Sequence, residues 1–286
     1  MRLREEKFGI LLIVPALCLL ALIALYPIVR SFHLSFTQRG EFVGLSNFVS
    51  IFHDERFRDA SLTTLLFFSI SVPLELIFGI GAALLLQGKF RGRGIVRAAH
   101  LIPWALPTVV MAVAWKWIFN DAYGVFNDIL LRLGIIHEPI AWLGLPGKAF
   151  FCIIVAEVWK CVPFVTIIVL AGLQSIPPEL YEALSVDGAG CWQRFRLITL
   201  PLLRPAILVV LIFRGIQALG VFDSIWVMTG GGPAGSTEPI SLYIYSTVFR
   251  YLSIGYASSM VTIAFLFSLL FACIVYFILT RRPVEY

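Results

Sequence analysis

Charged side chains lie within or at the edges of long apolar stretches of this sequence. They are Glu75, Lys116, Glu157, Lys160, Arg214 and Asp223. A charge at the middle of a bilayer costs about 2.5–3.5 kcal/mol, so such residues usually face other helices or a watery cavity. Together with the amide of Gln217 and the aromatic faces of Trp159, Phe164 and Phe222, they predict a polar pathway for a hydroxylated solute.

A second interpretation of these charges stays open. They would instead form ion pairs that bridge packed helices, an interpretation that suits Glu75, while Lys116 would extend to the outer surface. Glu157 and Lys160 are three residues apart on one helix face and are expected to pair with each other. Arg214 and Asp223 are nine residues apart and are expected to face different directions.

The elements that must hold these residues are membrane spans. Hydrophobic residues make up 59% of the 286 positions and charged residues 14%, against roughly 45–50% and about 25% in soluble proteins. Runs of about 20 apolar residues cross a hydrocarbon core, and within lipid they must be helical. Six such runs are predicted, at about 8–29, 62–86, 98–119, 150–173, 205–229 and 258–279. The first is longer than the apolar core of a signal peptide and lacks a cleavage site.

Several prolines and small residues lie inside these runs. Pro73, Pro103, Pro107 and Pro163 interrupt the second, third and fourth runs and are expected to kink them. Gly79, Gly81 and Ala83 give the second run a small-residue face for close helix contact.

The distribution of basic residues orients the spans. With a cytoplasmic N-terminus, twelve Lys and Arg residues lie inside and seven outside, and the densest cluster, Lys89 to Arg97, is inside. This bias follows the positive-inside rule and places both termini in the cytoplasm. Basic flanks and anionic lipid account for a pI near 9, so no nucleic acid partner is implied.

Cysteine and histidine patterns indicate neither a metal site nor catalysis. The five cysteines form no Cys-x-x-Cys pair, and those within spans act as small apolar residues. The four histidines are scattered, which argues against a membrane-embedded enzyme. All of residues 1–286 are taken up by spans and loops, so a single transmembrane domain is expected.

The loops differ in character. Residues 44–52 and 126–133 have the spacing of short amphipathic helices in outer loops. Gly230 to Pro233 predict an irregular outer turn, and a phosphate loop is excluded there because no Lys-Ser/Thr follows.

The inner loop at 174–204 predicts a helix–turn–helix. Pro177 and Pro178 end one helix and start another, and Gly188 and Gly190 permit a sharp bend. A second short helix is expected from Trp192 to Leu197 before Pro201 returns the chain to the bilayer. The alternative is a re-entrant or surface-bound connection.

Within this loop the spacing of Glu182-Ala183, Gly188, Ile198 and Leu200-Pro201 resembles the cytoplasmic signature of binding-protein-dependent ABC importer permeases. The pattern departs at Leu184, where the family usually has alanine. Other segments resemble the carbohydrate branch, in the right order along almost the whole chain. They are Tyr26-Pro-Ile28, Ser35-Phe36, Gly44 to Phe48, Ala156 to Lys160, Pro163-Phe164, Phe222-Asp223 and Thr229 to Pro233.

The resemblance implies an all-α, type I ABC importer permease with six transmembrane helices. It implies that the inner loop sits in a cleft of a cytoplasmic ATPase, whose ATP-driven closure moves the spans. The implied ATPase-coupling residues are Tyr181, Glu182, Ala183, Leu184, Asp187, Gly188, Ala189 and Pro201. Leu180 and Val186 are expected to complete a rigid apolar knob, and Glu182 is expected to pair with donors at the rim of the cleft.

The resemblance also implies the partners: a second permease in a heterodimer, two ATPase subunits that bind ATP and Mg, and an extracytoplasmic solute-binding protein. This chain itself has no Gly-x-x-x-x-Gly-Lys-Ser/Thr motif and is expected to bind no cofactor and to catalyse no reaction. A multi-pass protein of a bacterial or archaeal cell membrane is expected.

The implied solute is a di- or oligosaccharide such as trehalose or maltose, with glycerol phosphate or another polyol-derived solute as the alternative. An ion-coupled secondary transporter is disfavoured, because such proteins show repeated halves with broken helices and no repeat is evident here.

Overall fold

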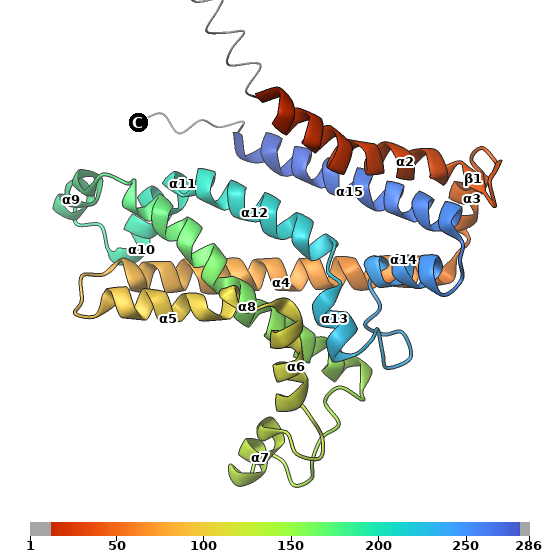
Figure 1. The fold of residues 1–286 in the computed structure, drawn as a ribbon. Helices are drawn as coiled ribbons and strands as arrows, with labels where there is room; N and C mark the ends of the chain where they lie inside the picture. Colours follow the sequence, from red (N-terminus) through yellow and green to blue (C-terminus); the bar gives the residue numbers. More distant parts are fainter. Residues whose placement is uncertain (1–12, 281–286) are drawn as a thin grey trace, which may run out of the picture. The chain divides into compact units, whose positions relative to one another are not determined.

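The computed structural model describes residues 13–280, which are mostly helical (Figure 1). The elements are η1 (Ala21–Leu25), α2 (Tyr26–Ser35), β1 (Thr37–Gln38), β2 (Glu41–Phe42), α3 (Ser46–Phe52), α4 (Glu55–Gln87), α5 (Arg93–Ala105), α6 (Thr108–Ile118), α7 (Val125–Arg132), α8 (Pro146–Gln174), α9 (Pro178–Val186), α10 (Cys191–Arg194), η2 (Phe195–Thr199), α11 (Leu200–Leu202), α12 (Arg204–Leu219), α13 (Asp223–Met228), α14 (Ile240–Phe249) and α15 (Ile254–Thr280). The elements η1 and η2 are π-helical turns. The expected start of the first span at Phe8 and the terminal basic residues lie outside the described residues.

Within residues 13–280, four helices are long and apolar enough to cross a membrane: Ile13–Ser35, α4, α8 and α15. Two bent helix pairs meet the same test when each pair is counted as one span. They are α5 with α6, bent by 91°, and Cys191–Leu202 with α12, bent by 64°. The helices therefore supply between four and six spans of a multi-pass membrane protein.

The third predicted run is two helices rather than one. Leu106 has an extended backbone (φ −69°, ψ 137°) before Pro107, as expected for a residue that precedes proline. Pro73, Pro103 and Pro163 lie inside helices that continue past them, so Pro107 is the proline at which the chain breaks.

The fifth predicted run is also interrupted. Helix α12 ends at Leu219, and α13 starts only at Asp223. The expected amphipathic helices in the loops are present as α3 and α7. The β1–β2 hairpin and α14 were not predicted.

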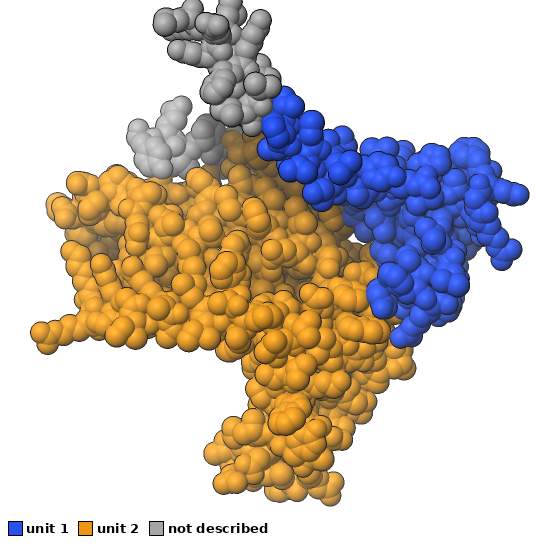
Figure 2. Space-filling model, viewed as in Figure 1, with its two compact units in different colours: residues 1–58, 243–266 blue, residues 59–242, 267–286 orange. Residues whose placement is uncertain are grey.

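The chain forms two compact units, coloured separately in Figure 2. Unit 1 comprises residues 1–58 and 243–266. Within it, the buried amide of Asn47 donates to the carbonyls of Ser35 and Thr37 at 2.9 and 3.0 Å, which holds the hairpin against α3.

Unit 2 comprises residues 59–242 and 267–286 and has α8 at its centre (Figure 1). Helix α8 packs against α5 and α12, and 61% of its most apolar segment is buried. A Cβ at Gly79 would lie 2.4 Å from Cγ1 of Val165, so this glycine permits close contact between α4 and α8. The expected small-residue face is confirmed at Gly79 and at the buried Ala83, whereas Gly81 has no neighbour within 4 Å.

Candidate functional site

The inner loop has the predicted helix–turn–helix form. Helix α9 begins at Pro178, directly after Pro177. Its end is closed by hydrogen bonds from the N–H of Gly188 to the carbonyl of Ser185 at 3.2 Å and from that of Ala189 to Leu184 at 2.9 Å. Gly188 has φ +78°, a conformation that residues with a Cβ rarely adopt. This glycine therefore makes the turn between the two arms.

The second arm is longer than predicted. It runs from Cys191 to Leu202 through the π-helical turn η2, and the chain changes direction after Leu203 rather than at Pro201. The guanidinium of Arg194 donates to Ser185 Oγ at 3.1 Å and approaches Cys191 Sγ at 3.5 Å. The hydrogen bond to Ser185 joins the second arm to α9.

A buried apolar cluster attaches the loop to the long helices. It contains Leu173 near the end of α8, Ile176 just after that helix, Ile198 in η2, Leu203 just before α12 and Val210 within α12. The side chains of Tyr181 and Leu184 in α9 pack against this cluster, and the Tyr181 hydroxyl lies 2.9 Å from Thr199 Oγ1. The loop is therefore packed as a continuation of α8 and α12.

The outward face of the loop exposes apolar side chains. Val186 is 87% exposed, Trp192 71% and Leu197 62%. The predicted knob is divided, because Leu180, Ala183 and Val186 point outward while Tyr181 and Leu184 point inward. Glu182 and Asp187 are also exposed, and neither pairs with a base within residues 13–280. The loop therefore presents an apolar surface with two free carboxylates.

A buried charge cluster lies deeper in unit 2. Arg214 of α12 donates from Nε to Glu75 Oε2 at 2.7 Å and from Nη2 to Glu75 Oε1 at 2.9 Å. The same Nη2 donates to Glu157 Oε1 at 3.0 Å. All three side chains are at least nine-tenths buried. The cluster joins α4, α8 and α12 through one guanidinium.

Neutral side chains complete this cluster. Nη1 of Arg214 donates to Gln217 Oε1 at 2.5 Å, Ser224 Oγ donates to Glu157 Oε2 at 3.2 Å, and Cys161 Sγ lies 3.5 Å from Glu157 Oε1. The ligand atoms of Glu75, Glu157 and Cys161 lie within 4.8 Å of one another, a spacing that suits a metal. The guanidinium of Arg214 already supplies the positive charge that a metal ion would bring to these carboxylates.

The expected pair between Glu157 and Lys160 is wrong. Lys160 Nζ donates instead to the carbonyl of Leu106 at 2.7 Å, which is the carbonyl at the break between α5 and α6. Asp223 and Arg214 face different directions, as predicted: Asp223 is exposed at the start of α13 and Arg214 is buried. Lys116 is exposed and donates to the carbonyl of Val227 at 3.2 Å.

Aromatic rings from α5, α8 and α12 contact one another. Phe164 stacks on Trp104 with ring centroids 5.8 Å apart and lies 6.2 Å from Phe213. Phe164 follows Lys160 by one helical turn of α8, so these two residues share a face. Phe222 stacks on Trp226 in a separate group at α13.

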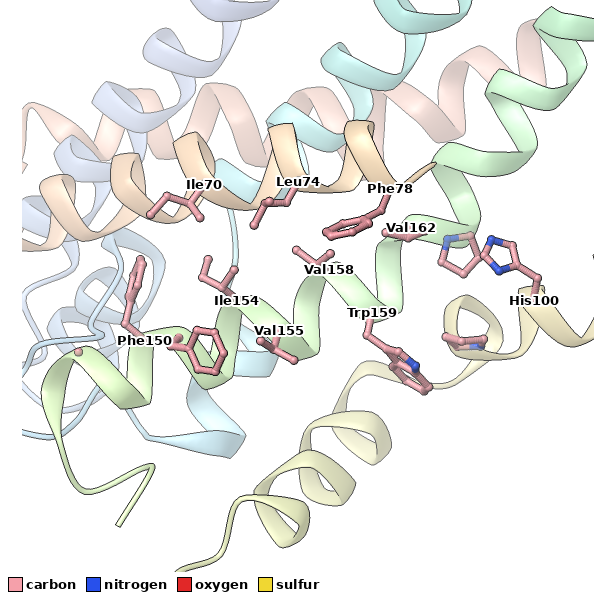
Figure 3. A pocket seen from close by; sticks show the side chains of 14 residues that line it. Ile70, Leu74, Phe78, His100, Phe150, Ile154, Val155, Val158, Trp159 and Val162 are labelled. Carbon is pink, nitrogen blue, oxygen red and sulfur yellow. The ribbon is translucent and has the colours of Figure 1, made fainter. Parts of the chain in front are cut away.

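Trp159 lies in a different place. It lines an apolar groove of about 780 Å³ between α4, α5 and α8, which His100 and Phe78 also line (Figure 3). His100 is bonded to Thr166 Oγ1 at 3.0 Å, and the other lining side chains are apolar. The structure therefore brings Glu157, Arg214 and Gln217 together. It places Phe164 against Phe213 of α12 and Lys160 at the break between α5 and α6. Trp159 lines the groove, and Phe222 and Asp223 lie at the start of α13.

Residues 75–283 match the model of the family described as "Binding-protein-dependent transport system inner membrane component". The trehalose/maltose transport system permease protein MalF of Thermococcus litoralis is 44% identical over 261 residues, covering 89% of this chain and 86% of that protein. The sulfoquinovosyl glycerol transport system permease protein SmoG of Agrobacterium fabrum is 42% identical, covering 93% of this chain and 88% of its own length.

Solved structures show the same fold. A bacterial ABC transporter that imports the acidic polysaccharide alginate contains a chain that matches with a TM-score of 0.87 at 24% identity, covering 99% of this chain and 98% of its own length. A structure of a bacterial alginate transporter with its alginate pentasaccharide-bound periplasmic protein matches with a TM-score of 0.85 at 25% identity, covering 98% and 96%.

Proposed function

We propose that this chain, which belongs to the family of binding-protein-dependent transport system inner membrane components, forms part of the pathway by which an ATP-driven importer moves a di- or oligosaccharide across the membrane. A trehalose- or maltose-like solute is proposed because the relative of that name is similar over most of both chains. A polyol-derived solute such as a glycerol phosphate is the second candidate, favoured by the relative named for sulfoquinovosyl glycerol.

The observation that carries the proposal is the way the inner loop is attached. Tyr181 and Leu184 pack against the buried cluster that includes Leu173 of α8 and Val210 of α12. A force applied to α9 therefore moves both long helices, because closely packed interiors transmit displacement with little compression. A flexible loop would absorb the same displacement.

The force would come from a separate ATPase. In our proposal the ATPase cleft holds the exposed Leu180, Ala183 and Val186, while Glu182 and Asp187 bind donors at its rim. ATP and Mg are bound by that subunit. ATP binding shifts the permease only if the contact with the ATPase differs in free energy between the inward-facing and outward-facing states. Hence the apolar contact at α9 must be stronger in one of these two states.

Three further partners complete the proposed importer. A second permease covers part of the exposed apolar surface, a second ATPase subunit binds that permease, and an extracytoplasmic solute-binding protein docks on the outer loops. Both termini and the loop at 174–204 are proposed to be cytoplasmic, in the inner membrane of a bacterium or the cell membrane of an archaeon. The crystallised alginate transporter in complex with its periplasmic protein supports the docking partner by analogy.

The solute pathway is proposed to pass the shared face of α8 and α12. Lys160 and Gln217 supply hydrogen-bond donors there, and Phe164 supplies a ring face for a sugar. Gln217 is exposed between the apolar Ile216 and Ala218 of α12, which supports this placement, since polar side chains within membrane segments usually face protein or water rather than lipid.

The test is uptake into proteoliposomes that contain the whole complex. Labelled trehalose or maltose is expected to accumulate only with ATP and the binding protein. After replacement of the exposed Cys18, Cys191 and Cys273, a cysteine at Ala183 is expected to crosslink to the ATPase, and one at Leu133 is not. Uptake that an ion gradient drives without ATP, or a crosslink from Leu133 alone, would refute the proposal.

A further inference from the structure

We propose that an anionic phospholipid binds in a groove between the end of α4 and the second arm of the inner loop, the inner groove. This groove has a volume of about 640 Å³, within the range of about 300–1,000 Å³ that is usual for small-molecule sites. The proposal goes beyond the transport activity and does not depend on which solute is carried. It assigns a ligand to apolar side chains and cations that neither the solute pathway nor the ATPase contact uses.

Apolar side chains form the walls of the inner groove. Leu84 comes from the last turn of α4, and Trp192 and Phe195 come from the second arm. The rings of Trp192 and Phe195 stack with their centroids 5.6 Å apart. Helix α4 is long enough to be a span, and the second arm meets the same test together with α12. The inner groove therefore lies near the boundary of the hydrocarbon core, where tryptophan is enriched.

One guanidinium lines the inner groove without a carboxylate partner. Arg194 donates from Nη1 to the neutral hydroxyl of Ser185, and its Nη2 lies beside Cys191 Sγ. Within residues 13–280, no carboxylate forms an ion pair with Arg194, and its buried Nε–H has no hydrogen-bond partner. A phosphate suits this position, because the planar N–H groups of a guanidinium match the geometry of phosphate oxygens.

Further cations lie at the end of α4. The exposed basic residues of the connection into α5 are Lys89, Arg91 and Arg93. Arg97 of α5 donates from Nε and Nη2 to the carbonyl of Leu86 at 3.2 and 2.6 Å. This contact holds the basic connection at the end of α4, next to the helical turn whose Leu84 lines the inner groove.

No carboxylate on these two segments offsets their charge. The sequence has no Asp or Glu between Glu75 and Asp121, and none between Asp187 and Asp223. The acidic residues of the inner loop lie on α9 or at its end and are exposed: Glu179, Glu182 and Asp187. The inner groove therefore combines apolar walls with cations. This combination matches an acyl chain that carries an anionic headgroup, as in the anionic lipids of the cytoplasmic leaflet.

The apolar walls favour a lipid over a free phosphate. Each buried CH₂ group of an acyl chain adds to binding, whereas inorganic phosphate gains nothing from Leu84, Trp192 or Phe195. Each basic residue near an anionic headgroup raises lipid binding roughly fivefold. Arg194 and the basic connection should therefore favour an anionic lipid over a zwitterionic one by at least about tenfold.

The experiment measures quenching of Trp192 fluorescence by brominated lipids. The complete complex is reconstituted in phosphatidylcholine vesicles that contain increasing fractions of phosphatidylglycerol or phosphatidylcholine with brominated acyl chains. The contribution of Trp192 is the difference between each protein and its Trp192→Phe counterpart. Half-maximal quenching is expected at a mole fraction of brominated phosphatidylglycerol that is lower by about tenfold or more. Equal quenching by both lipids, or by neither, would overturn the proposal.

Two variants remove cations of the site. Arg194→Gln and Arg91→Gln are each expected to reduce the preference for phosphatidylglycerol roughly fivefold. Because Arg91 is exposed in the connection between α4 and α5, its variant tests the proposal even if Arg194→Gln does not fold. The matched control is Arg204→Gln, which makes the same charge change at the start of α12, outside the inner groove. It is expected to keep the preference.

Two further outcomes would contradict the proposal. An equal loss of preference in Arg194→Gln and Arg204→Gln would show that anionic lipids are attracted to the basic surface in general, without a specific site. An excess of inorganic phosphate at constant ionic strength is expected to leave the quenching unchanged. Displacement of the brominated lipid by phosphate would mean that the inner groove binds a free anion instead of a lipid.

Discussion

The hydroxyl of Tyr181 in α9 lies 2.9 Å from Thr199 Oγ1 in the π-helical turn that leads towards α12. This hydrogen bond joins the two arms of the inner loop at the level of the buried apolar cluster. We expect Tyr181→Phe to weaken the interaction between the two arms by about 0.5–1.5 kcal/mol. The loosened loop should then hydrolyse more ATP for each sugar imported, as measured by parallel ATPase and uptake assays in proteoliposomes.

The control for this variant is Tyr123→Phe, which removes a hydroxyl from an exposed tyrosine outside the inner loop. It should leave the ratio of ATP to sugar unchanged. The same ratio in wild type and Tyr181→Phe would contradict a role of the hydroxyl in coupling.

Gly188→Val should uncouple ATP hydrolysis from transport. A β-branched residue at φ +78° is strained by about 1–3 kcal/mol, so the turn between the two arms should open while the spans stay folded. Uptake should be lost with a near-normal unfolding temperature. Gly94→Val is the matched control, since Gly94 lies in open space in α5 with no positive φ, and normal uptake by Gly188→Val would rule the prediction out.

Arg214→Met should strongly destabilise the protein. It leaves two buried carboxylates without a cation, which typically costs about 3–5 kcal/mol. Arg214→Lys should rescue little, because an ammonium does not reproduce the bidentate geometry with Glu75. Thermal unfolding of the purified complex tests this, with Arg132→Met as control.

Arg132 pairs with Asp128 at the surface, with side chains 78% and 53% exposed. Such an exposed pair contributes at most about 1 kcal/mol. Equal unfolding temperatures for the Arg214 and Arg132 variants would mean that the buried cluster is not needed for stability.

Gly79→Ala and Gly81→Ala should have opposite effects, although both glycines lie in α4. The new methyl group at Gly79 would overlap Val165, and such overpacking costs about 1–3 kcal/mol. At Gly81 it meets no atom within 4 Å, so the better helix propensity of alanine should stabilise the helix slightly. A higher unfolding temperature for Gly79→Ala than for wild type would contradict the packing described above.

Asp54 should make unit 1 sensitive to acid. Burial raises the pKa of Asp54, but hydrogen bonds from the hydroxyls of Tyr243 and Tyr256 and from two backbone N–H groups outweigh it and hold the pKa below its ordinary value. A lowered folded pKa means that the carboxylate stabilises the fold above its unfolded pKa of about 3.9. That contribution is lost as the pH falls through the folded pKa.

Hydrogen exchange compares wild type with Asp54→Asn at each pH. Residues 46–58 and 243–266 should exchange faster in the variant at pH 7, and this difference should shrink as the pH falls through the folded pKa. Asp128→Asn, at an exposed helix position, serves as the control. A difference that stays constant with pH would exclude Asp54 as the acid-sensitive group.

The inner loop was predictable because its signals are local. Pro177, Pro178 and Gly188 determine where helices start and turn regardless of what surrounds them. The extension of the second arm through η2 was missed, because packing of Ile198 against the ends of α8 and α12 stabilises it and the sequence does not reveal that packing.

The charge cluster was only partly predictable. The apolar context of Glu75, Glu157 and Arg214 marked them as exceptional, but their partners are 57 and 139 residues apart in sequence. The spacing of Glu157 and Lys160 along α8 favoured an ion pair between them. Lys160 instead donates to the carbonyl of Leu106, which the break between α5 and α6 leaves without a helical partner. Helix α14 was missed because a helix of ten residues is too short to register as a span.

The break between α5 and α6 has a consequence for motion. The carbonyl of Leu106 lies at a bend and is satisfied by Lys160 from α8. In hydrocarbon an unsatisfied carbonyl costs several kcal/mol. Any rearrangement at this bend must therefore keep Lys160 beside the Leu106 carbonyl or give that oxygen another donor, which couples the angle between α5 and α6 to the position of α8.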